Sequence, residues 1–332
     1  MPKAHRSRRG SMQVWPRVRA KRIYPRISRF TGPAAKEVKL RGFAGYKVGM
    51  THIIITDARK TSMTKGEDVR FPVTIVECPP IRIMGVRFYK MQYNGIQPAF
   101  DIIAKADKEL ARKIDAPKKE AKRKIADVKP EEFDRLKIII QTQPKMTGIG
   151  KKLPEVFEVC VGGKKEEQLA FAKEHLGKDV SVKDVFTPGE LIDIHAVTTG
   201  KGFQGPVKRF GVRVRHHKSE KTKRGPGVIA GGWSAQGQTM YRVAHAGQMG
   251  FHNRVDYNKQ ICMISDDPKQ VNVSGGYVNY GNVKTTYIVL KGSVIGPKKR
   301  IVRLEKALRP NKKIDQAAPT IQYISTASKQ GN

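Results

Sequence analysis

Residues 42–57, GFAGYKVGMTHIIITD, decide the fold that we predict for this chain of 332 residues. The second half of the stretch is rich in β-branched side chains, and residues typical of turns bound it, so it reads as a strand or a strand pair. Residues 71–78, FPVTIVEC, and 81–90, IRIMGVRFYK, have the same character. The chain from 42 to 96 therefore predicts β-sheet.

Strand-like segments return in the second half of the chain. They are 190–203 ELIDIHAVTTGKGF, 260–265 QICMIS, 275–281 GGYVNYG, 285–296 TTYIVLKGSVIG, 299–308 KRIVRLEKAL and 320–326 TIQYIST. Because strands occur early and late, we expect one discontinuous β-barrel, made of 42–96 and 181–332. The predicted class is mainly β.

Residues 97–180 are expected to form an α/β insertion into this barrel. Helical composition covers 107–128, with Pro117 as a break, and 130–142, with Pro130 at the first helical position. Residues 156–163, VFEVCVGG, predict a short strand. The clearest helix is 164–177, with its apolar side and its C-terminal glycine at Leu169, Phe171, Ala172, Leu176 and Gly177.

The stretch 198–260 follows no sustained apolar period and is expected to extend from the barrel as a finger. Residues 198–261 carry twelve Lys and Arg against two acids, Glu220 and Asp256, and contain many glycines. A loop this long is usually disordered or functional, and disordered linkers are poor in aromatic residues. Aromatic side chains recur here, Trp233 among them. We therefore expect the finger to become ordered against a polyanion, and to be mobile in the free protein.

The N-terminal residues 1–41 form a second basic extension, with thirteen Lys and Arg against one acid, Glu37. Four prolines and repeated Arg-x-Arg steps argue against a regular helix. A solvated arm is the usual free state of such a segment. Trp15, Tyr24 and Phe30 interrupt the charge, however, and this favours an arm that folds on RNA through stacking and phosphate contacts.

The composition points to a nucleic-acid partner. The formal net charge is +36 and the pI is near 10.2, which requires counter-charge that nucleic acid supplies. No apolar run approaches a membrane span, and the basic N-terminus lacks the apolar segment of a secretory signal. Cys78, Cys160 and Cys262 are too scattered for a disulfide framework, so we expect reduced, buried thiols in a cytosolic protein.

Three other interpretations of the central stretch were weighed. Gly200–Gly205, GKGFQG, has the G-x-G-x-x-G spacing of dinucleotide sites, but the residues that follow do not predict an amphipathic helix. His216, His217, His245, His252 and Cys262 do not have the spacing of zinc ligands, so no metal is expected. An RNA-modifying enzyme that uses GKGFQG for a nucleotide, and a DNA-packing protein, remain the alternatives to a structural RNA-binding protein.

Specific motifs along the whole chain resemble one family. They are 5–17 HRSRRGSMQVWPR, 44–52 AGYKVGMTH, 197–212 VTTGKGFQGPVKRFGV, 246–254 AGQMGFHNR and 285–302 TTYIVLKGSVIGPKKRIV. With them the chain resembles the L-three family of large-subunit ribosomal proteins, of the archaeal type. The resemblance implies a translation-protein-type β-barrel with long N-terminal and central extensions. It also implies a ribosomal protein of the cytoplasm with no enzymatic activity of its own.

The resemblance implies partners and site residues as well. The partners would be large-subunit rRNA, in its 3′ region and near the peptidyl transferase centre, and neighbouring large-subunit proteins; a role in subunit assembly is implied, and no membrane. Trp233 would stand at the finger tip, and Gln248 occupies the place of a glutamine that bacterial members methylate. No cofactor is expected, and any structural Mg²⁺ or monovalent ion would be bound through the rRNA.

The candidate RNA-binding residues are mainly basic and aromatic side chains of the two extensions, with a basic turn at 297–300. They are Arg6, Arg8, Arg9, Trp15, Arg17, Arg19, Lys201, Lys208, Arg209, Arg213, Arg215, His216, His217, Lys221, Lys223, Arg224, Trp233, Arg242, His245, Gln248, His252, Arg254, Lys298, Lys299 and Arg300. Arg209, Arg213 and Arg215 alternate with apolar residues, which favours a ribbon with one cationic edge.

Overall fold

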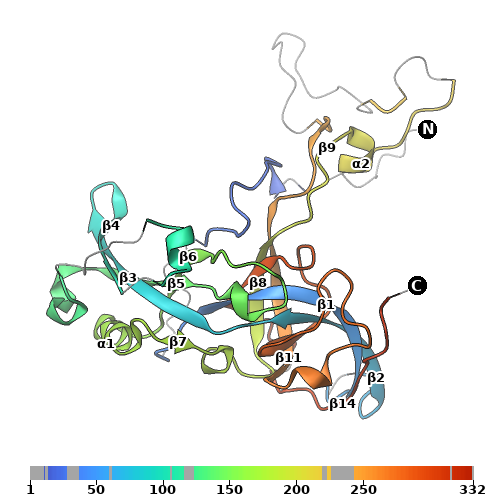
Figure 1. Cartoon of the computed structure of the whole chain (residues 1–332). Helices are drawn as coiled ribbons and strands as arrows, with labels where there is room; N and C mark the ends of the chain where they lie inside the picture. Colours follow the sequence, from blue (N-terminus) through green and yellow to red (C-terminus); the bar gives the residue numbers. More distant parts are fainter. Residues whose placement is uncertain are drawn as a thin grey trace, which may run out of the picture. The chain divides into compact units, whose positions relative to one another are not determined.

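The computed structural model describes residues 11, 14–27, 37–59, 62–104, 107–115, 123–218, 223–225, 243–314 and 316–330. The chain divides into two compact units: the first comprises 1–23 with 197–254, and the second comprises 24–196 with 255–332. Strands predominate over helices in the described residues, which confirms the mainly β class. Each unit is described by itself (Figure 1).

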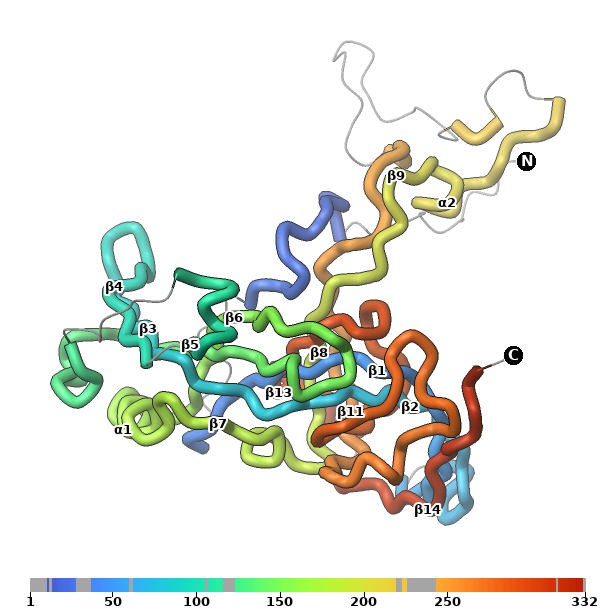
Figure 2. The backbone as a smooth tube through the Cα atoms, in the orientation of Figure 1, coloured from blue at the N-terminus to red at the C-terminus, as the bar shows by residue number. Residues whose placement is uncertain are grey.

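The larger sheet belongs mainly to the second unit. Its strands are β1 Gly42–Thr56, β2 Asp68–Glu77, β8 Leu191–Val197, β11 Asn253–Ser265, β12 Tyr287–Lys291, β13 Ile301–Lys306 and β14 Ile321–Ile324. Their order is β13-β8-β11-β12-β2-β1-β14, and β13 pairs with β1 as well as with β8. The hydrogen-bonded order therefore closes on itself, and early β1 lies beside late β13 (Figure 2).

A second, antiparallel sheet lies in the same unit. Its strands are β3 Ile81–Gln92, β4 Gly95–Ile103, β5 Arg135–Gln141, β6 Val156–Cys160 and β7 Asp179–Val180. The order is β4-β3-β5-β6, and β7 pairs with β3. This sheet already begins at Ile81, whereas the predicted insertion begins at 97, because β3 pairs with β4 along one edge and with β5 along the other.

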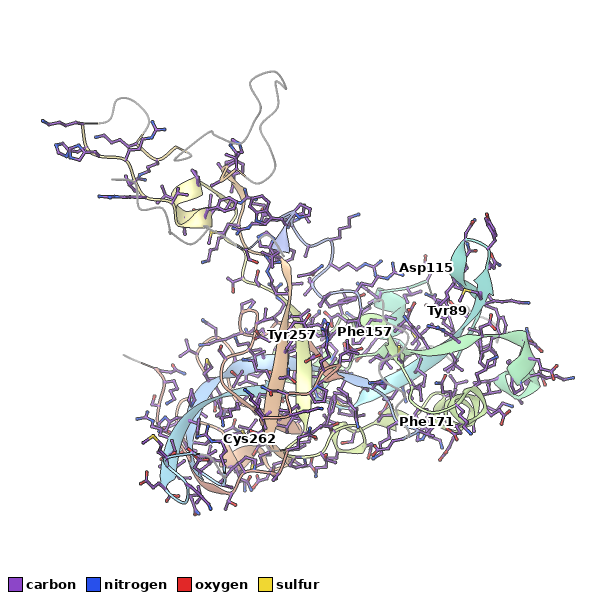
Figure 3. All side chains as sticks on the ribbon, turned by 180° about the vertical axis from the view of Figure 1, so that it is seen from behind. Tyr89, Asp115, Phe157, Phe171, Tyr257 and Cys262 are labelled. Atoms are coloured by element: carbon purple, nitrogen blue, oxygen red, sulfur yellow. The ribbon has the colours of Figure 1, made fainter. Side chains whose placement is uncertain are left out.

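One continuous hydrophobic core joins the two sheets of this unit. Tyr46 on β1 is buried, and its hydroxyl lies 3.1 Å from both Thr142 Oγ1 and Glu155 Oε2, beside the second sheet. Phe157 on β6, labelled in Figure 3, belongs to the same core. Burial of apolar side chains at roughly 25 cal/mol per Å² is the main force that holds the sheets together.

Short helices complete the structure. They are α1 Lys165–His175, α2 Pro206–Phe210, and the 3₁₀ turns η2 Leu110–Arg112, η3 Ile125–Asp127, η4 Pro130–Glu132, η5 Pro144–Met146, η6 Val182–Asp184 and η7 Pro268–Gln270. The predicted helix 164–177 is confirmed as α1, and Gly177 follows it with a φ of +81°. Pro130 does open a helical turn, as predicted.

Three predictions of secondary structure were wrong. Residues 107–128 form only the turns η2 and η3 in their described part, and 116–122 lie outside it. Residues 135–141 form β5 instead of a helix, since the buried β-branched run Ile138–Ile140 fits the middle of a sheet. Residues 275–281 form a turn with a single bridge, Tyr277 to Gly281, because Gly275 and Gly276 both have positive φ.

Candidate nucleic-acid interface

A narrow ribbon forms the base of the first unit. β9 Phe203–Gln204 pairs antiparallel with β10 Gly247–Gln248. Backbone hydrogen bonds continue this pairing between the residues before β9 and those after β10. They run from Lys201 N to Met249 O at 3.0 Å and from Thr198 N to His252 O at 3.0 Å. The predicted finger boundary at 260 is therefore too late, because β11 begins at Asn253.

Two glycines allow this ribbon to form. Gly250 has a φ of +71°, and a Cβ atom there would lie 2.1 Å from Thr199 O, which no side chain tolerates. Gly202 has a φ of +68°, and a Cβ atom there would meet nothing within 4 Å. Glycine is favoured at this position only because other residues rarely adopt this backbone conformation. Gly202, the second glycine of GKGFQG, thus serves the backbone of the ribbon itself.

The helix α2 follows directly after Gly205, contrary to the prediction that no helix opens there. Pro206 occupies its first turn, where its fixed φ and missing N–H are tolerated, and Gly211 ends it in the left-handed conformation with a φ of +68°. One turn is all that fits between these residues. Because α2 is so short, it lacks the length of the helix that carries a dinucleotide site.

The N-terminal segment packs on this part of the same unit. Arg17 Nη1 donates to Arg209 O at 2.7 Å, and the Arg17 guanidinium lies 4.1 Å from the centroid of the Phe210 ring. Trp15 meets the same ring edge-on, at 5.8 Å between centroids. Ala20 N donates to Phe251 O at 2.7 Å. The two extensions that the sequence presents separately thus form one compact body.

The Arg209 side chain links separate segments of this unit. Its Nε donates to Gln248 O at 3.0 Å and its Nη1 donates to His245 O at 2.9 Å. It therefore ties α2 to the returning strand of the ribbon. The predicted cationic ribbon of Arg209, Arg213 and Arg215 is wrong, because Arg209 is helical and 211–216 contain no strand.

Positive charges accumulate in the described residues of this unit. Its described residues carry thirteen Lys and Arg and no Asp or Glu. Burial lowers the pKa of Arg17, and the neighbouring Arg209 and Arg254 lower it further. Arginine remains protonated despite such a shift. The cluster therefore holds uncompensated positive charge, which a polyanion would stabilise.

His252 lies buried among these arginines. Its Nδ1 donates to Val18 O at 2.7 Å. Burial lowers the pKa of His252, the bond to Val18 opposes this, and the charges of Arg254, Arg17 and Arg209 lower it further. The ring is therefore neutral at pH 7 and acts as a link between the N-terminal segment and the ribbon.

The charge pattern of this unit suits a polyanionic partner. The family model described as ribosomal protein L3 matches residues 1–331. The chain belongs to the ribosomal protein L3 family. It is 44% identical over 339 residues to large ribosomal subunit protein uL3 of Methanobrevibacter smithii, and 45% identical over 341 residues to that of Methanosphaera stadtmanae, with all of each chain covered. The protein of the same name from Archaeoglobus fulgidus is 43% identical, with 99% of each chain covered.

In this L3-family chain the candidate residues fall into distinct groups. Those exposed on the first unit are Arg19, Lys201, Lys208, Arg213, Arg215, His216, His217, Lys223, Arg224 and His245. Those partly buried there are Trp15, Arg17, Arg209, Gln248 and Arg254, while His252 is buried. Arg6, Arg8, Arg9, Lys221, Trp233 and Arg242 lie outside the described residues. The exposed group presents its side chains at the surface of the unit, whereas the second group shapes the unit.

The basic turn at 297–300 lies in the second unit, between β12 and β13, as expected. Lys298 and Lys299 are exposed, Arg300 is half-buried, and Lys299 has a φ of +66°. The turn is held by Lys47, whose backbone accepts from Lys299 N at 2.8 Å and donates to Arg300 O at 3.0 Å. The turn thus presents two lysines from a fixed backbone.

Sequence reasoning missed the roles of Phe210 and Phe251. The Arg17 guanidinium lies over the Phe210 ring, and Arg19 lies 5.1 Å from the centroid of Phe251. The sequence does contain a signal for these contacts. Isolated aromatic residues occur in the finger, and Arg-x-Arg steps that can pack on them occur in the arm. The cysteines are free, as expected; Cys78 and Cys262 are buried and Cys160 is half-buried.

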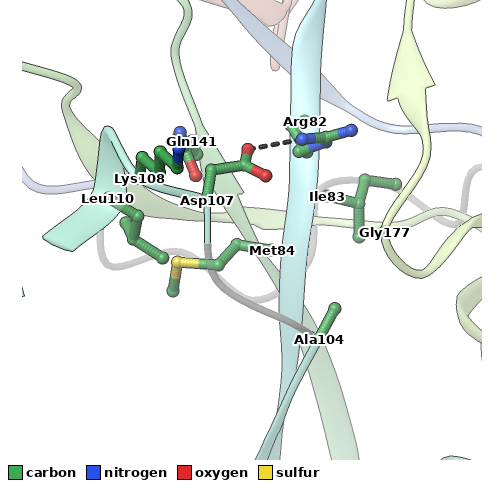
Figure 4. Close-up of a pocket in the computed structure, with 9 residues that line it drawn as sticks. All are labelled: Arg82, Ile83, Met84, Ala104, Asp107, Lys108, Leu110, Gln141 and Gly177. Atoms are coloured by element: carbon green, nitrogen blue, oxygen red, sulfur yellow. Dashed lines mark hydrogen bonds and ion pairs between the residues drawn. The ribbon is translucent and has the colours of Figure 1, made fainter. Parts of the chain in front are cut away.

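A pocket of about 480 Å³ lies beside the second sheet (Figure 4). It is lined by Arg82, Ile83, Met84, Ala104, Asp107, Lys108, Leu110, Gln141 and Gly177. Arg82 forms an ion pair with Asp107 and lies 3.3 Å from Asp179. Two carboxylates thus neutralise this cation, and the pocket does not extend the basic interface.

Other kinds of site have less support in the described ranges. No group of three or more His, Cys, Asp and Glu side chains there could hold a metal ion. No helix among the described residues has the length and apolarity needed to cross a membrane.

Proposed function

We propose that this chain is a structural constituent of the large ribosomal subunit, and that it binds large-subunit rRNA chiefly through its first unit. One observation carries the proposal: thirteen Lys and Arg without an acid in the described residues of that unit. The relatives with which it shares its full length are named as large ribosomal subunit proteins. Phosphate contacts would provide most of the affinity, since counterion release drives the binding of cations to nucleic acid.

The arrangement of the first unit suggests how the contacts are divided. Exposed cations such as Arg213 and Arg215 would pair with phosphates, while Arg17 and Arg209 hold the surface in shape. Aromatic side chains would stack on unpaired bases. The protein performs no reaction in this scheme, and its effect on translation arises from the RNA conformation that it stabilises.

The finer proposals follow from the family resemblance. The bound RNA would be the 3′ region of the large-subunit rRNA and the vicinity of the peptidyl transferase centre, with Trp233 at the tip of the finger. The chain would support subunit assembly in the cytoplasm, beside neighbouring ribosomal proteins. Gln248 is a candidate for methylation. The closed strand order supports a translation-protein-type barrel, into which the second sheet, from β3 onward, would be inserted and from which the finger would extend as far as the start of β11.

Co-sedimentation with large subunits through a high-salt wash tests this function. The full chain should remain bound, and the double variant Arg17→Ala, Arg209→Ala should be released at lower salt. Release of the unaltered chain by a moderate wash would argue against a structural constituent. Equilibrium dialysis with nucleotides tests the rival enzyme, because saturable binding by the free protein would support a cofactor site at GKGFQG.

A further inference from the structure

The second unit carries exposed cations and an exposed aromatic ring of its own. Tyr257 on β11 is 58% exposed (Figure 3). The segment that follows β13, residues 307–313, has the sequence ALRPNKK, and its Arg309, Lys312 and Lys313 are all exposed. A scattered exposed tyrosine is ordinary on a protein surface, so the inference depends on how this one is held.

A buried carboxylate fixes both parts of this surface. Asp193 on β8 is 1% exposed, and its Oδ1 accepts from Asn258 N at 3.0 Å. Its Oδ2 accepts from Leu308 N at 3.1 Å. One side chain thus anchors the residue after Tyr257 and the start of the basic segment. Because a buried carboxylate is costly unless it is hydrogen-bonded, both bonds should persist in the folded chain.

Asn258 completes the attachment. It adopts a left-handed conformation with a φ of +55°, which is uncommon for a residue other than glycine. Its side-chain Oδ1 accepts from Asn311 N at 3.1 Å, and Asn311 Oδ1 accepts from Lys313 N at 3.0 Å. A chain of hydrogen bonds therefore runs from β11 to Lys313. The residue next to Tyr257 is thus hydrogen-bonded to the basic segment.

The charge of this surface is positive. Arg309, Lys312 and Lys313 form no ion pair within the described residues. The nearby acid Asp256 lies 3.9 Å from Lys259 Nζ, so these two offset each other. The sequence 307–317 contains three cations and one acid, Asp315. An aromatic platform beside unpaired cations is the arrangement that binds single-stranded nucleic acid, in which bases stack and phosphates pair.

We propose that Tyr257, with Arg309, Lys312 and Lys313, forms a second RNA-binding site that takes an unpaired nucleotide. The base stacks on the Tyr257 ring, and the cations contact the phosphates on either side. This inference rests on the proposed binding of rRNA, and it adds a site on the second unit. An acidic protein segment is the rival occupant, and it would pair with the cations without stacking a base.

Chemical probing of RNA bases in large subunits that contain the full chain tests this site. The variants are Tyr257→Ala, Tyr257→Phe and the triple variant Arg309→Ala, Lys312→Ala, Lys313→Ala. Tyr93→Ala is the matched control, because Tyr93 is a fully exposed tyrosine in the turn between β3 and β4. We expect one base to become reactive with Tyr257→Ala, to stay protected with Tyr257→Phe, and to be unaffected by Tyr93→Ala.

Two further measurements sharpen the result. Ultraviolet irradiation should crosslink the peptide that contains Tyr257 to a nucleotide. Binding of the full chain to single-stranded rRNA fragments should weaken about 5- to 100-fold with Tyr257→Ala, in line with the loss of one stacked base. The triple variant should reduce the slope of log affinity against log salt by about 2, at roughly 0.7 per phosphate contact on a single strand.

The outcomes distinguish failure of the Tyr257 site from failure of the proposed rRNA binding. If Tyr257→Ala changes no base while Arg17→Ala still exposes RNA near the extensions, the second site is wrong and rRNA binding stands. A crosslink from Tyr257 to protein would likewise overturn the RNA site in favour of the acidic partner. If the unaltered chain fails to enter subunits at all, the proposed function fails, and this inference fails with it.

Discussion

Arg17 donates from Nη1 to the backbone oxygen of Arg209, 2.7 Å away, although the two residues stand 192 positions apart in the chain. Both side chains are cationic, so the bond forms against their mutual repulsion. The contact of Arg17 with Phe210 and the bonds from Arg209 to the ribbon offset that repulsion. The N-terminal arm is thereby bound to the central finger within one unit.

This pair predicts non-additive effects on RNA binding. Arg17→Ala or Arg209→Ala alone should weaken RNA binding and disorder the partner residue, because each arginine helps to hold the exposed cations in place. The double variant should lose less than the sum of the single losses, because each arginine supports the other. Arg17→Lys should rescue only partly, since lysine lacks the planar group that stacks on Phe210. Filter binding across a salt series measures all four, and strict additivity would contradict the coupling.

Gly250→Ala should open the ribbon of the first unit. The added Cβ would meet Thr199 O at 2.1 Å, in a backbone conformation that alanine disfavours. A local destabilisation of about 1–3 kcal/mol is expected, visible as faster hydrogen exchange at Lys201 and Phe251. Gly205→Ala is the matched control, because a Cβ atom there meets nothing within 4 Å. Equal exchange in the two variants would show that this close approach is unimportant.

Glu77 supports the core of the second unit. This buried carboxylate accepts from the Tyr280 hydroxyl, from Lys284 N at 2.8 Å and from Thr285 N at 2.9 Å. Glu77→Gln replaces an acceptor with a donor, and we expect the free energy of unfolding to fall by roughly 2–4 kcal/mol. Urea unfolding should show little change for the exposed control Glu67→Gln. A small effect of Glu77→Gln would mean that water replaces these bonds.

The thiols should be unreactive in the folded chain. Burial raises the pKa of Cys160 from 9.0 to about 11, although the nearby Lys137 opposes the shift. At pH 8 the thiolate fraction, and with it the alkylation rate, should therefore be about 100-fold lower than in the unfolded chain. Since the unfolded thiol loses its proton first, the free energy of unfolding is unaffected below pH 9 and falls as the pH rises toward 11. Alkylation of Cys160 at the unfolded rate would contradict its burial.

Deletion of the outer part of the finger, residues 205–246, should leave the two sheets of the second unit folded. Deletion of 205–246, with Gln204 joined to Gly247 through Asn-Gly, closes the ribbon with a two-residue hairpin turn. The deleted stretch carries nine Lys and Arg and contributes few residues to the core. The melting temperature of the sheet unit should shift by only about a few degrees, while affinity for rRNA falls steeply. Loss of cooperative melting would show that the finger helps to hold the sheets.

Sequence patterns predicted those elements whose local and tertiary preferences agree. Residues 42–56 and 164–177 are examples, the first β-branched and the second a helix with a C-terminal glycine. Pro130 at the first helical position favours a helix over 130–142, yet burial on the sheet makes 135–141 a strand. The union of arm and finger depends on the Arg17 and Arg209 contact, which no local pattern encodes. The sequence identifies the individual cations. It does not show which of them stabilise the first unit and which are exposed.

The pairing of β1 with β13 has a consequence for biosynthesis. β13 is synthesised long after β1 and β8, so each of these strands keeps an unsatisfied edge until Lys306 has been added. Open strand edges attract other chains. A chain that stops before Ile301 should therefore aggregate instead of folding in part. The basic arm and finger are synthesised before β13 and can meet RNA while the sheet is still open.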